Sequence, residues 1–313
     1  MPSRIVFTGK QRVEVEDFEL RPPRDEETVV RTLYSLMSTG TENIAFNRNF
    51  DPGTHWEAWV RYPFRPGYLS VGTTEDGTHV FHRRPHASHH CVPLAHCTPV
   101  PDSVNPRDAT WCGLAKIAFS GRTVADYRIG EDVVIVGAGP IGQMSVRWAH
   151  ASGLATVTVI DLTPFRLELA RRGGATETIQ RPVAECGLSD VPLVIDTTGN
   201  ADVLPECLRI CGRFGRVVLL GDTGRPGTQH LTSDVIVKGL TIVGTHDMHD
   251  RGGWPEPRVN ALFFNLVTTG RFSLDGLITH VLDPRDASKA YELANTARDE
   301  TMGICFDWTQ AGL

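Results

Sequence analysis

The feature that most constrains the fold is a short apolar run followed by three closely spaced glycines. The run "DVVIV" (Asp132–Val136) leads into "GAGPIG", in which Gly137, Gly139 and Gly142 follow a G-x-G-x-x-G pattern, and a helical pattern comes next. The next apolar run, "TVTVI", ends at Asp161, about 20 residues after the last glycine. Strand, glycines, helix, strand and acid in this order predict a dinucleotide-binding βαβ unit.

The same residues indicate which dinucleotide is bound. The glycines allow a tight turn and let the backbone approach a pyrophosphate at the N-terminus of the following helix. The Asp161 carboxylate would accept hydrogen bonds from the adenosine ribose and repel a 2′-phosphate, which favours NAD(H) over NADP(H). Arg166, five residues further on, would favour the phosphate, so the NADP(H) alternative stays open.

The chain changes its pattern near Asp132. From there, apolar β-branched runs alternate with helical patterns as far as "TIVG", which is typical of a parallel sheet covered by helices on both faces. Residues 1 to about 105 read instead as short strands punctuated by Gly and Pro, without a long helical period, and short strand and helix signals return from about Phe272. We therefore predict an α/β fold with divisions at residues 1–120, 121–267 and 268–313.

Length, charge and cysteine content narrow the class of protein. The 313 residues exceed what one hydrophobic core usually serves, and the formal net charge of −6 disfavours a nucleic-acid partner. No run of roughly 18 apolar residues and no cleavable leader pattern are present, so we expect no membrane partner. Seven cysteines at irregular positions suit a reducing compartment, and we expect a cytoplasmic protein.

A cluster of metal-binding residue types lies in "PHASHHCVPLAHC", Pro85 to Cys97. Its spacing lacks the two close pairs of ligands that structural zinc sites usually show, and a strand would point alternate residues to opposite faces. We predict a structural strand here and keep a metal site as the alternative. His86 remains a candidate site residue, because it lies in the loop before the strand.

The motifs of the chain resemble those of the medium-chain dehydrogenase/reductase superfamily, whose best-known members are zinc alcohol dehydrogenases. Besides "VVIVGAGPIG", they are "STGTEN" (Ser38–Asn43), "RPGYLSVG" (Arg65–Gly72), "VVLLGDTG" (Val217–Gly224) and "FSLDGLITHVLDP" (Phe272–Pro284). The resemblance implies a doubly wound Rossmann sheet at 121–267 and a β-rich GroES-like catalytic domain at 1–120, which residues 268–313 complete. It also implies the cofactor-binding set Gly137, Gly139, Pro140, Ile141, Gly142, Asp161, Arg166, Thr198, Gly221 and His246.

The zinc ligands of that superfamily are mostly replaced in this chain. Thr39 stands where zinc members carry a cysteine, Gly67–Leu69 reads Gly-Tyr-Leu in place of Gly-His-Glu, and only Cys112 remains. A catalytic zinc needs three protein ligands, and the lobe with four close cysteines is missing as well. The chain is therefore similar to the zinc-lacking bacteriochlorophyllide-type dehydrogenases, and we expect no metal.

Without zinc, another group must donate a proton or a positive charge to the substrate oxygen. In "DATWCGLAKIAFSGRTV", Lys116 is the only charge between Ala109 and Phe119, and a lone buried lysine needs a partner or a task. By family register Lys116 lies near the nicotinamide, where desolvation would lower its pKa and make it a general acid/base. The alternative is an ammonium that reaches solvent or pairs with a carboxylate such as Glu42.

Other candidates follow from the resemblance. Thr41 aligns with the proton-relay hydroxyl of zinc members, or is a simple turn residue; Glu42 would orient Lys116 or Thr41, or be structural. Tyr68 replaces the family histidine, and its phenol either reaches the substrate oxygen or fills the vacated volume. His246 lies near the family's carboxamide contacts. The catalytic candidates are thus Lys116, Thr41, Glu42, Tyr68 and His86.

The expected function is a zinc-independent, NAD-dependent oxidoreductase. It would interconvert a secondary alcohol and a ketone on a polar small molecule such as a cyclitol, a sugar or a specialised metabolite. The alternatives are reduction of activated C=C bonds and a non-catalytic nucleotide-binding sensor or partner subunit. The resemblance also implies a homodimer formed through the edge strand near "TIVGTHD".

Overall fold

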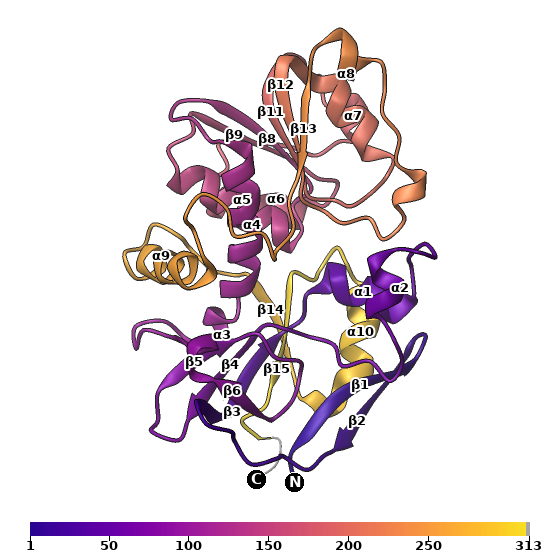
Figure 1. Ribbon diagram of the computed structural model, residues 1–313. Helices are drawn as coiled ribbons and strands as arrows, with labels where there is room; N and C mark the ends of the chain where they lie inside the picture. The colour runs from indigo at the N-terminus through magenta and orange to yellow at the C-terminus, as the bar shows by residue number, and fades with distance from the viewer. Residues whose placement is uncertain (311–313) are drawn as a thin grey trace. The chain divides into compact units, whose positions relative to one another are not determined.

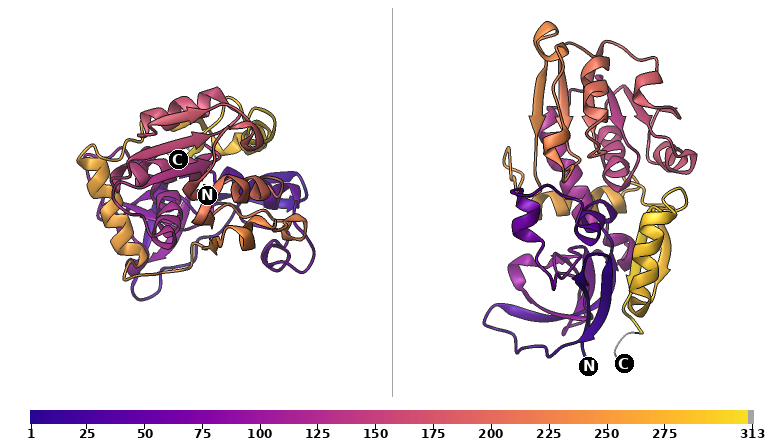
Figure 2. Two further views of the ribbon diagram at one scale, coloured as in Figure 1. Left: turned by 90° about the horizontal axis from the view of Figure 1, so that it is seen from above. Right: turned by 90° about the vertical axis from the view of Figure 1, so that its right-hand side faces the viewer.

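The computed structural model describes residues 1–310, and these form two compact units (Figures 1 and 2). Among the described residues, the first unit comprises Met1–Gly113, Asn260–Thr269 and 276–310, and the second comprises Leu114–Val259 and Gly270–Asp275. The divisions expected from the sequence, after residues 120 and 267, lie several residues beyond the two main boundaries.

The second unit is built on a six-stranded parallel sheet (Figure 1). Its strand order is β10-β9-β8-β11-β12-β13, where the strands are β8 (Asp132–Val136), β9 (Thr156–Ile160), β10 (Glu177–Ile179), β11 (Val191–Asp196), β12 (Cys211–Leu219) and β13 (Thr241–Gly244). The helices are α4 (Cys112–Ala125, which begins in the first unit), α5 (Pro140–Ala151), α6 (Pro164–Arg172), α7 (Val203–Ile210) and α8 (Asp234–Val237). A short 3-10 turn, η2 (Val183–Glu185), precedes β11, and another, η3 (Pro226–Thr228), follows β12.

Alternate residues of these strands pack against helices on opposite faces of the sheet. Ile135 of β8 lies in one core cluster with residues of α4, α5 and α6, whereas Val134 lies in a second cluster with residues of α7. Because both faces are covered, the strands consist of continuous apolar runs. The predicted doubly wound parallel sheet is confirmed.

The first unit contains a seven-stranded, mainly antiparallel sheet and a two-stranded ribbon. The ribbon is β1 (Ser3–Gly9) with β2 (Arg12–Asp17). The sheet order is β14-β15-β3-β4-β5-β7, and β6 also pairs with β3; the strands are β3 (Glu27–Leu36), β4 (Ser70–Thr74), β5 (His79–His82), β6 (His89–Pro93), β7 (Thr98–Pro99), β14 (Ile278–Leu282) and β15 (Gly303–Asp307). The helical segments are α1 (Thr39–Asn47), α2 (His55–Trp59), η1 (Leu94–His96), α3 (Pro106–Ala109), α9 (Glu256–Thr268, which begins in the second unit), η4 (Pro284–Asp286) and α10 (Ala287–Thr296).

Two helices, α1 and α2, lie in the segment that we predicted to be mainly β. Both are short, and short helices owe their stability to tertiary packing more than to their own propensity. Ala45 of α1 and Trp56 of α2 are buried in one core cluster with Tyr291 of α10. Thr41, for which a simple turn was the alternative, and Glu42 therefore lie in the first turn of a helix.

The histidine-rich stretch forms a strand, as predicted. β6 runs antiparallel to β3 and ends at Pro93, where η1 follows. Within residues 1–310, no group of three or more His, Cys, Asp or Glu side chains is arranged to hold a metal ion. Over the same residues, none of the helices has the length and apolar character needed to cross a membrane.

Candidate functional site

The glycine loop of the second unit has a backbone shape that only glycine accommodates. Gly137 has φ +92°, and a Cβ placed there would lie 2.8 Å from the Thr197 hydroxyl oxygen. A Cβ on Gly142 would lie 2.0 Å from the carbonyl oxygen of Gly137. Pro140 and Ile141 open helix α5 between these glycines. The loop thus presents bare backbone at the helix N-terminus, which is the arrangement that receives a pyrophosphate.

Asp161 holds this loop through two hydrogen bonds to backbone N–H groups. Its Oδ2 accepts a hydrogen bond of 2.7 Å from the backbone N–H of Ala138, and its Oδ1 accepts one of 2.8 Å from Thr163. The carboxylate therefore ties the loop after β8 to the start of α6. Arg166 lies close by, because a Cβ on Gly139 would be 3.8 Å from one of its guanidinium nitrogens.

The remaining cofactor candidates follow neighbouring strands of the same sheet. Thr198 comes directly after β11, and its hydroxyl donates to Asp196 Oδ1 at 2.7 Å. Gly221 follows β12, where a Cβ would lie 2.3 Å from the backbone nitrogen of Gly199. His246 follows β13 and is exposed. The structure thus brings the candidates together at the carboxyl ends of the parallel strands, which is where open α/β sheets bind ligands.

Lys116 is buried, as predicted, with 4% of its surface exposed. Its ammonium donates to the carbonyl oxygen of Asp247 and lies 3.4 Å from a carboxylate oxygen of Asp247 and 3.4 Å from one of Asp250. The paired alternative therefore describes this structure, although the partners are these two aspartates and not Glu42. Glu42 does not orient Lys116 here, since its carboxylate is engaged within the first unit.

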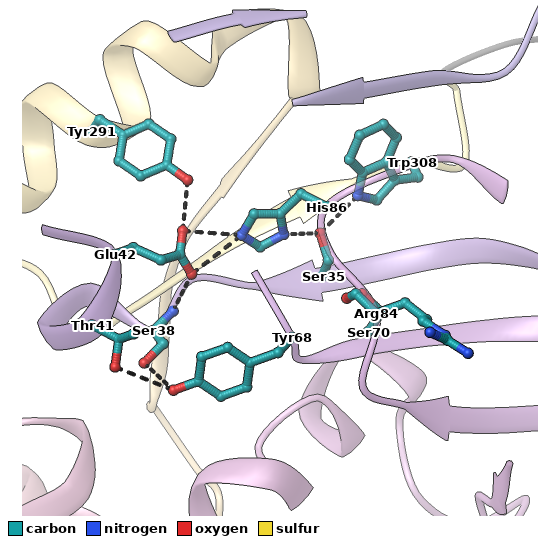
Figure 3. Close-up of polar contacts among 10 residues, drawn as sticks. All are labelled: Ser35, Ser38, Thr41, Glu42, Tyr68, Ser70, Arg84, His86, Tyr291 and Trp308. Atoms are coloured by element: carbon teal, nitrogen blue, oxygen red, sulfur yellow. Dashed lines mark hydrogen bonds and ion pairs between the residues drawn. The ribbon is translucent and has the colours of Figure 1, made fainter. Parts of the chain in front are cut away.

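The first unit holds a buried polar network centred on Glu42 (Figure 3). Glu42 Oε1 accepts from the backbone N–H of Ser38 at 2.7 Å, and Oε2 accepts from the Tyr291 hydroxyl at 2.6 Å. His86 Nε2 lies 3.1 Å from Oε2, and His86 Nδ1 lies 2.7 Å from the Ser35 hydroxyl. His86 is fully buried and so does not line an open surface.

The glycine at position 67 makes room for this histidine. Gly67 has φ +91°, and a Cβ there would lie 2.6 Å from the His86 ring. Burial and the neighbouring Glu42 carboxylate raise the pKa of Tyr291 well above its ordinary value, so its hydroxyl remains a donor. Glu42 and His86 are therefore engaged with other buried groups of the first unit.

A cluster of hydroxyl groups lies beside this network (Figure 3). The Tyr68 phenol donates to Ser38 Oγ at 2.7 Å, and the Thr41 hydroxyl lies 3.4 Å from the phenol oxygen. Tyr68 and Thr41 are each only partly buried. The structure therefore brings the two predicted hydroxyl candidates together, and Tyr68 makes specific polar contacts besides filling space.

The donor set does not fit a catalytic zinc ion. Thr39 and Tyr68 offer neutral hydroxyls at positions where zinc members of the superfamily that the sequence resembles have a thiolate and an imidazole. Zinc prefers nitrogen and thiolate ligands. Glu42 and His86 are occupied with each other and with buried donors.

Sequence reasoning missed several residues of these groups: Ser35, Ser38, Asp247, Asp250, Tyr291 and Trp308. Tyr291 lies 249 positions from Glu42 and belongs to another helix. Ser38 is part of the "STGTE" motif, so its position was visible, but nothing in the motif shows that its hydroxyl contacts Tyr68.

Comparisons with known proteins agree with the fold. A family model described as zinc-binding dehydrogenase matches residues 140–260. The 5-exo-hydroxycamphor dehydrogenase of Pseudomonas putida is 33% identical over 210 residues, which cover 62% of this chain and 56% of that protein. The chain spans about half the length of the curated relatives that it matches.

Solved structures match over the whole length. An alcohol dehydrogenase from E. coli in complex with NADH has a TM-score of 0.81 at 18% identity, covering 98% of this chain and 99% of that one. A zinc-binding dehydrogenase from Sinorhizobium meliloti bound to NADP has the same TM-score, identity and coverage. At this identity the likeness shows the fold. In sequence, the chain is similar to zinc-binding dehydrogenases, and the family model covers residues 140–260.

Proposed function

We propose that the protein is a zinc-independent oxidoreductase that uses NAD(H) to interconvert a secondary alcohol and a ketone on a polar small molecule. The observation that carries the proposal is the bare glycine loop at the carboxyl ends of the parallel strands, where a Cβ on Gly142 would collide with the backbone. The hydroxycamphor dehydrogenase among the relatives is named for a secondary alcohol, which supports this reaction type.

The residues of the chain would share the work as follows. The loop from Gly137 to Gly142 binds the pyrophosphate, and Asp161 orients the loop and accepts from the ribose, which favours NAD(H). The bound nicotinamide supplies or accepts a hydride. In the first unit, the hydroxyls of Thr41 and Tyr68 would contact the substrate oxygen, while Glu42 accepts from the N–H of Ser38, whose hydroxyl holds the Tyr68 phenol.

Cofactor binding is tested by fluorescence titration of the metal-stripped protein with NADH and, in parallel, with NADPH. We expect NADH to bind at least tenfold more tightly, because the Asp161 carboxylate repels a 2′-phosphate. Failure to bind either nucleotide would remove the main support of the proposal. Preference for NADPH would make Arg166 the deciding residue.

Gly139→Ala separates binding from folding in the same titration. A Cβ at Gly139 meets ordinary packing, with its nearest atom 3.8 Å away, so the variant should fold normally. The added methyl group keeps the pyrophosphate from the backbone, and we expect NADH binding to weaken by about tenfold or more. Gly244→Ala, whose Cβ would lie 3.9 Å from Leu219 O, is the matched control and should bind as the wild type does.

Lys116 is a further candidate for the group that transfers the proton, besides the hydroxyls of Thr41 and Tyr68. Because its charge is already paired with Asp247 and Asp250, we expect Lys116→Ala to retain turnover of a secondary alcohol and to lose about 1–3 kcal/mol of stability. The comparison variant is Asp250→Asn, which keeps the lysine. Loss of turnover in Lys116→Ala with unchanged NADH binding and a normal melting temperature would instead make Lys116 the acid–base group.

The exposed edge of the Rossmann sheet supports a homodimer. β13 is the last strand in the sheet order, and the nearby helix α8 carries Ile236 and Val237, which are 88% and 76% exposed. Pairing of two such edges would cover both the unpaired strand and apolar side chains. Light scattering should give twice 34.4 kDa for the wild type and for the control Ile129→Glu, and a monomer for Ile236→Glu/Val237→Glu.

A further inference from the structure

The hydroxyl of Ser38 lies between the buried Glu42 network and the Tyr68 phenol (Figure 3). We propose that Tyr68 is the acid–base group of the reaction, that Ser38 is the positioning residue which holds its phenol, and that Arg83 stabilises the phenolate. This assignment rests on the proposed function and names the groups that perform its proton transfer.

Ser38 has an unusual role for a residue at the start of a helix. It occupies the N-cap position of α1, where a serine hydroxyl normally accepts from a free backbone N–H of the first turn, yet it makes no such bond. Its hydroxyl instead accepts from the Tyr68 phenol at 2.7 Å. Its own backbone N–H donates to Glu42 at 2.7 Å. Ser38 is thus fixed on one side and holds the phenol on the other.

The buried side of this arrangement is a connected set of hydrogen bonds that leads from Trp308 to Glu42. Trp308 Nε1 can only donate, and it donates to the Ser35 hydroxyl at 2.8 Å. The Ser35 hydroxyl lies 2.7 Å from His86 Nδ1, and His86 Nε2 lies 3.1 Å from Glu42 Oε2. Since Tyr291 and the Ser38 N–H also donate to Glu42, every contact ends on that carboxylate.

This chain of bonds lies away from solvent. Glu42, His86 and Tyr291 are at most 2% exposed, so the groups that hold Ser38 cannot easily reorient toward water. A fixed Ser38 in turn limits the directions in which the Tyr68 phenol can point. Precise placement of a proton donor matters because a misplacement of about 1 Å can cost roughly a hundredfold in rate.

Arg83 supplies positive charge to the same phenol. Its guanidinium carbon lies 5.9 Å from the centre of the Tyr68 ring, and its Nη2 donates to the carbonyl oxygen of Gly113 at 3.4 Å. A cation near an aromatic ring favours the deprotonated form of a phenol over the neutral form. The next residue, Arg84, points its side chain away from Tyr68 (Figure 3).

The proton transfer balances as follows. In the reductive direction, the carbonyl carbon of the substrate receives a hydride, the O–H bond of Tyr68 breaks, and its proton goes to the carbonyl oxygen. The products are the alcohol and a phenolate, and the phenolate regains a proton from water. In the oxidative direction, the phenolate takes the proton of the alcohol as the carbinol carbon gives up its hydride.

The test that needs no substrate is a spectrophotometric titration of tyrosine ionisation. The difference between the wild type and Tyr68→Phe isolates the Tyr68 transition. Arg83→Gln is expected to raise its midpoint by about one pH unit relative to the wild type, because a stabilising charge is lost. Arg84→Gln removes the same charge one residue away and should shift the midpoint much less. Equal shifts in the two variants, or none, would overturn the role of Arg83.

Ser38 is tested in the same titration and by turnover of the best secondary alcohol found in a screen. Ser38→Ala should change the Tyr68 midpoint and lower kcat by about a hundredfold with little change in KM, and Ser38→Thr should restore much of the rate. Ser103→Ala, at an exposed serine, should match the wild type. A Ser38→Ala variant with unchanged midpoint and kcat would refute the proposal. If NADH binds but the midpoint of Tyr68 ionisation is the same in the wild type, Arg83→Gln and Ser38→Ala, this inference fails and the proposed function stands.

Discussion

Glu42→Leu is expected to lower the free energy of unfolding of the first unit by about 3–5 kcal/mol. The substitution removes the acceptor of the Ser38 N–H, the Tyr291 hydroxyl and His86 Nε2, all of which are buried. Each donor then loses its partner without regaining water, and that desolvation cost exceeds the gain from a new apolar side chain. Denaturant unfolding followed by tryptophan fluorescence measures the change, since Trp308 joins the network through Ser35.

The matched controls separate charge from shape. Glu42→Gln keeps an acceptor oxygen but replaces the second one with a donor, so we expect an intermediate loss. Glu292→Gln alters an exposed glutamate on α10 and should change stability by less than about 0.5 kcal/mol. If Glu42→Leu unfolded with the same midpoint as Glu292→Gln, the network would contribute little to the stability of the unit.

The architecture of the second unit could be predicted from the sequence because its signals are local. Strands β8 and β9 are largely apolar runs, and each is followed by a helix whose start is marked by Gly or Pro, at Gly139–Pro140 and at Pro164. The glycine pattern also predicted where the loop Gly137–Gly142 lies. Gly142 approaches the backbone of Gly137 so closely that a side chain would not fit there. Local patterns of this kind need no knowledge of distant contacts.

The polar groups of the first unit could not be predicted in the same way. Glu42, His86 and Tyr291 come from α1, a loop and α10, and only tertiary packing brings them together. The partners of Lys116 were not predicted for a similar reason. Asp247 and Asp250 lie 131 or more positions away in the sequence, in a segment without a helix or strand pattern. A sequence shows that a buried charge needs a partner, but not which of many carboxylates supplies it.

The histidine-rich stretch also makes a tertiary contact that the sequence did not predict. His90 of β6 and His82 of β5 form a pair, with ring centroids 5.1 Å apart. His82 is fully buried, and neither of its ring nitrogens has a hydrogen-bond partner among residues 1–310. Burial, together with His90 and Arg84, lowers the pKa of His82 well below its ordinary value. Burial and Arg84 lower the pKa of His90 to about 3.

These two histidines should make the first unit acid-sensitive. In the unfolded chain both titrate near 6.5, whereas the folded unit resists protonation until much lower pH, so the unfolded state binds more protons between these values. The stabilisation is therefore complete above about pH 6.5 and is lost as pH falls, at about 1.4 kcal/mol per pH unit for each histidine. Between pH 6.5 and 5 the pair should cost about 3 kcal/mol, which is a large part of a typical folding free energy.

His82→Leu should halve this slope and leave stability at neutral pH unchanged or higher, because it removes two buried nitrogens that lack partners. Hydrogen exchange of peptides from β5 and β6, measured at pH 7 and pH 5 and corrected for intrinsic exchange, reports the local opening free energy. His96→Gln, at an exposed histidine of η1, should retain the full slope. If His82→Leu kept the wild-type dependence of the opening free energy on pH, protonation of His82 would not destabilise the sheet in acid.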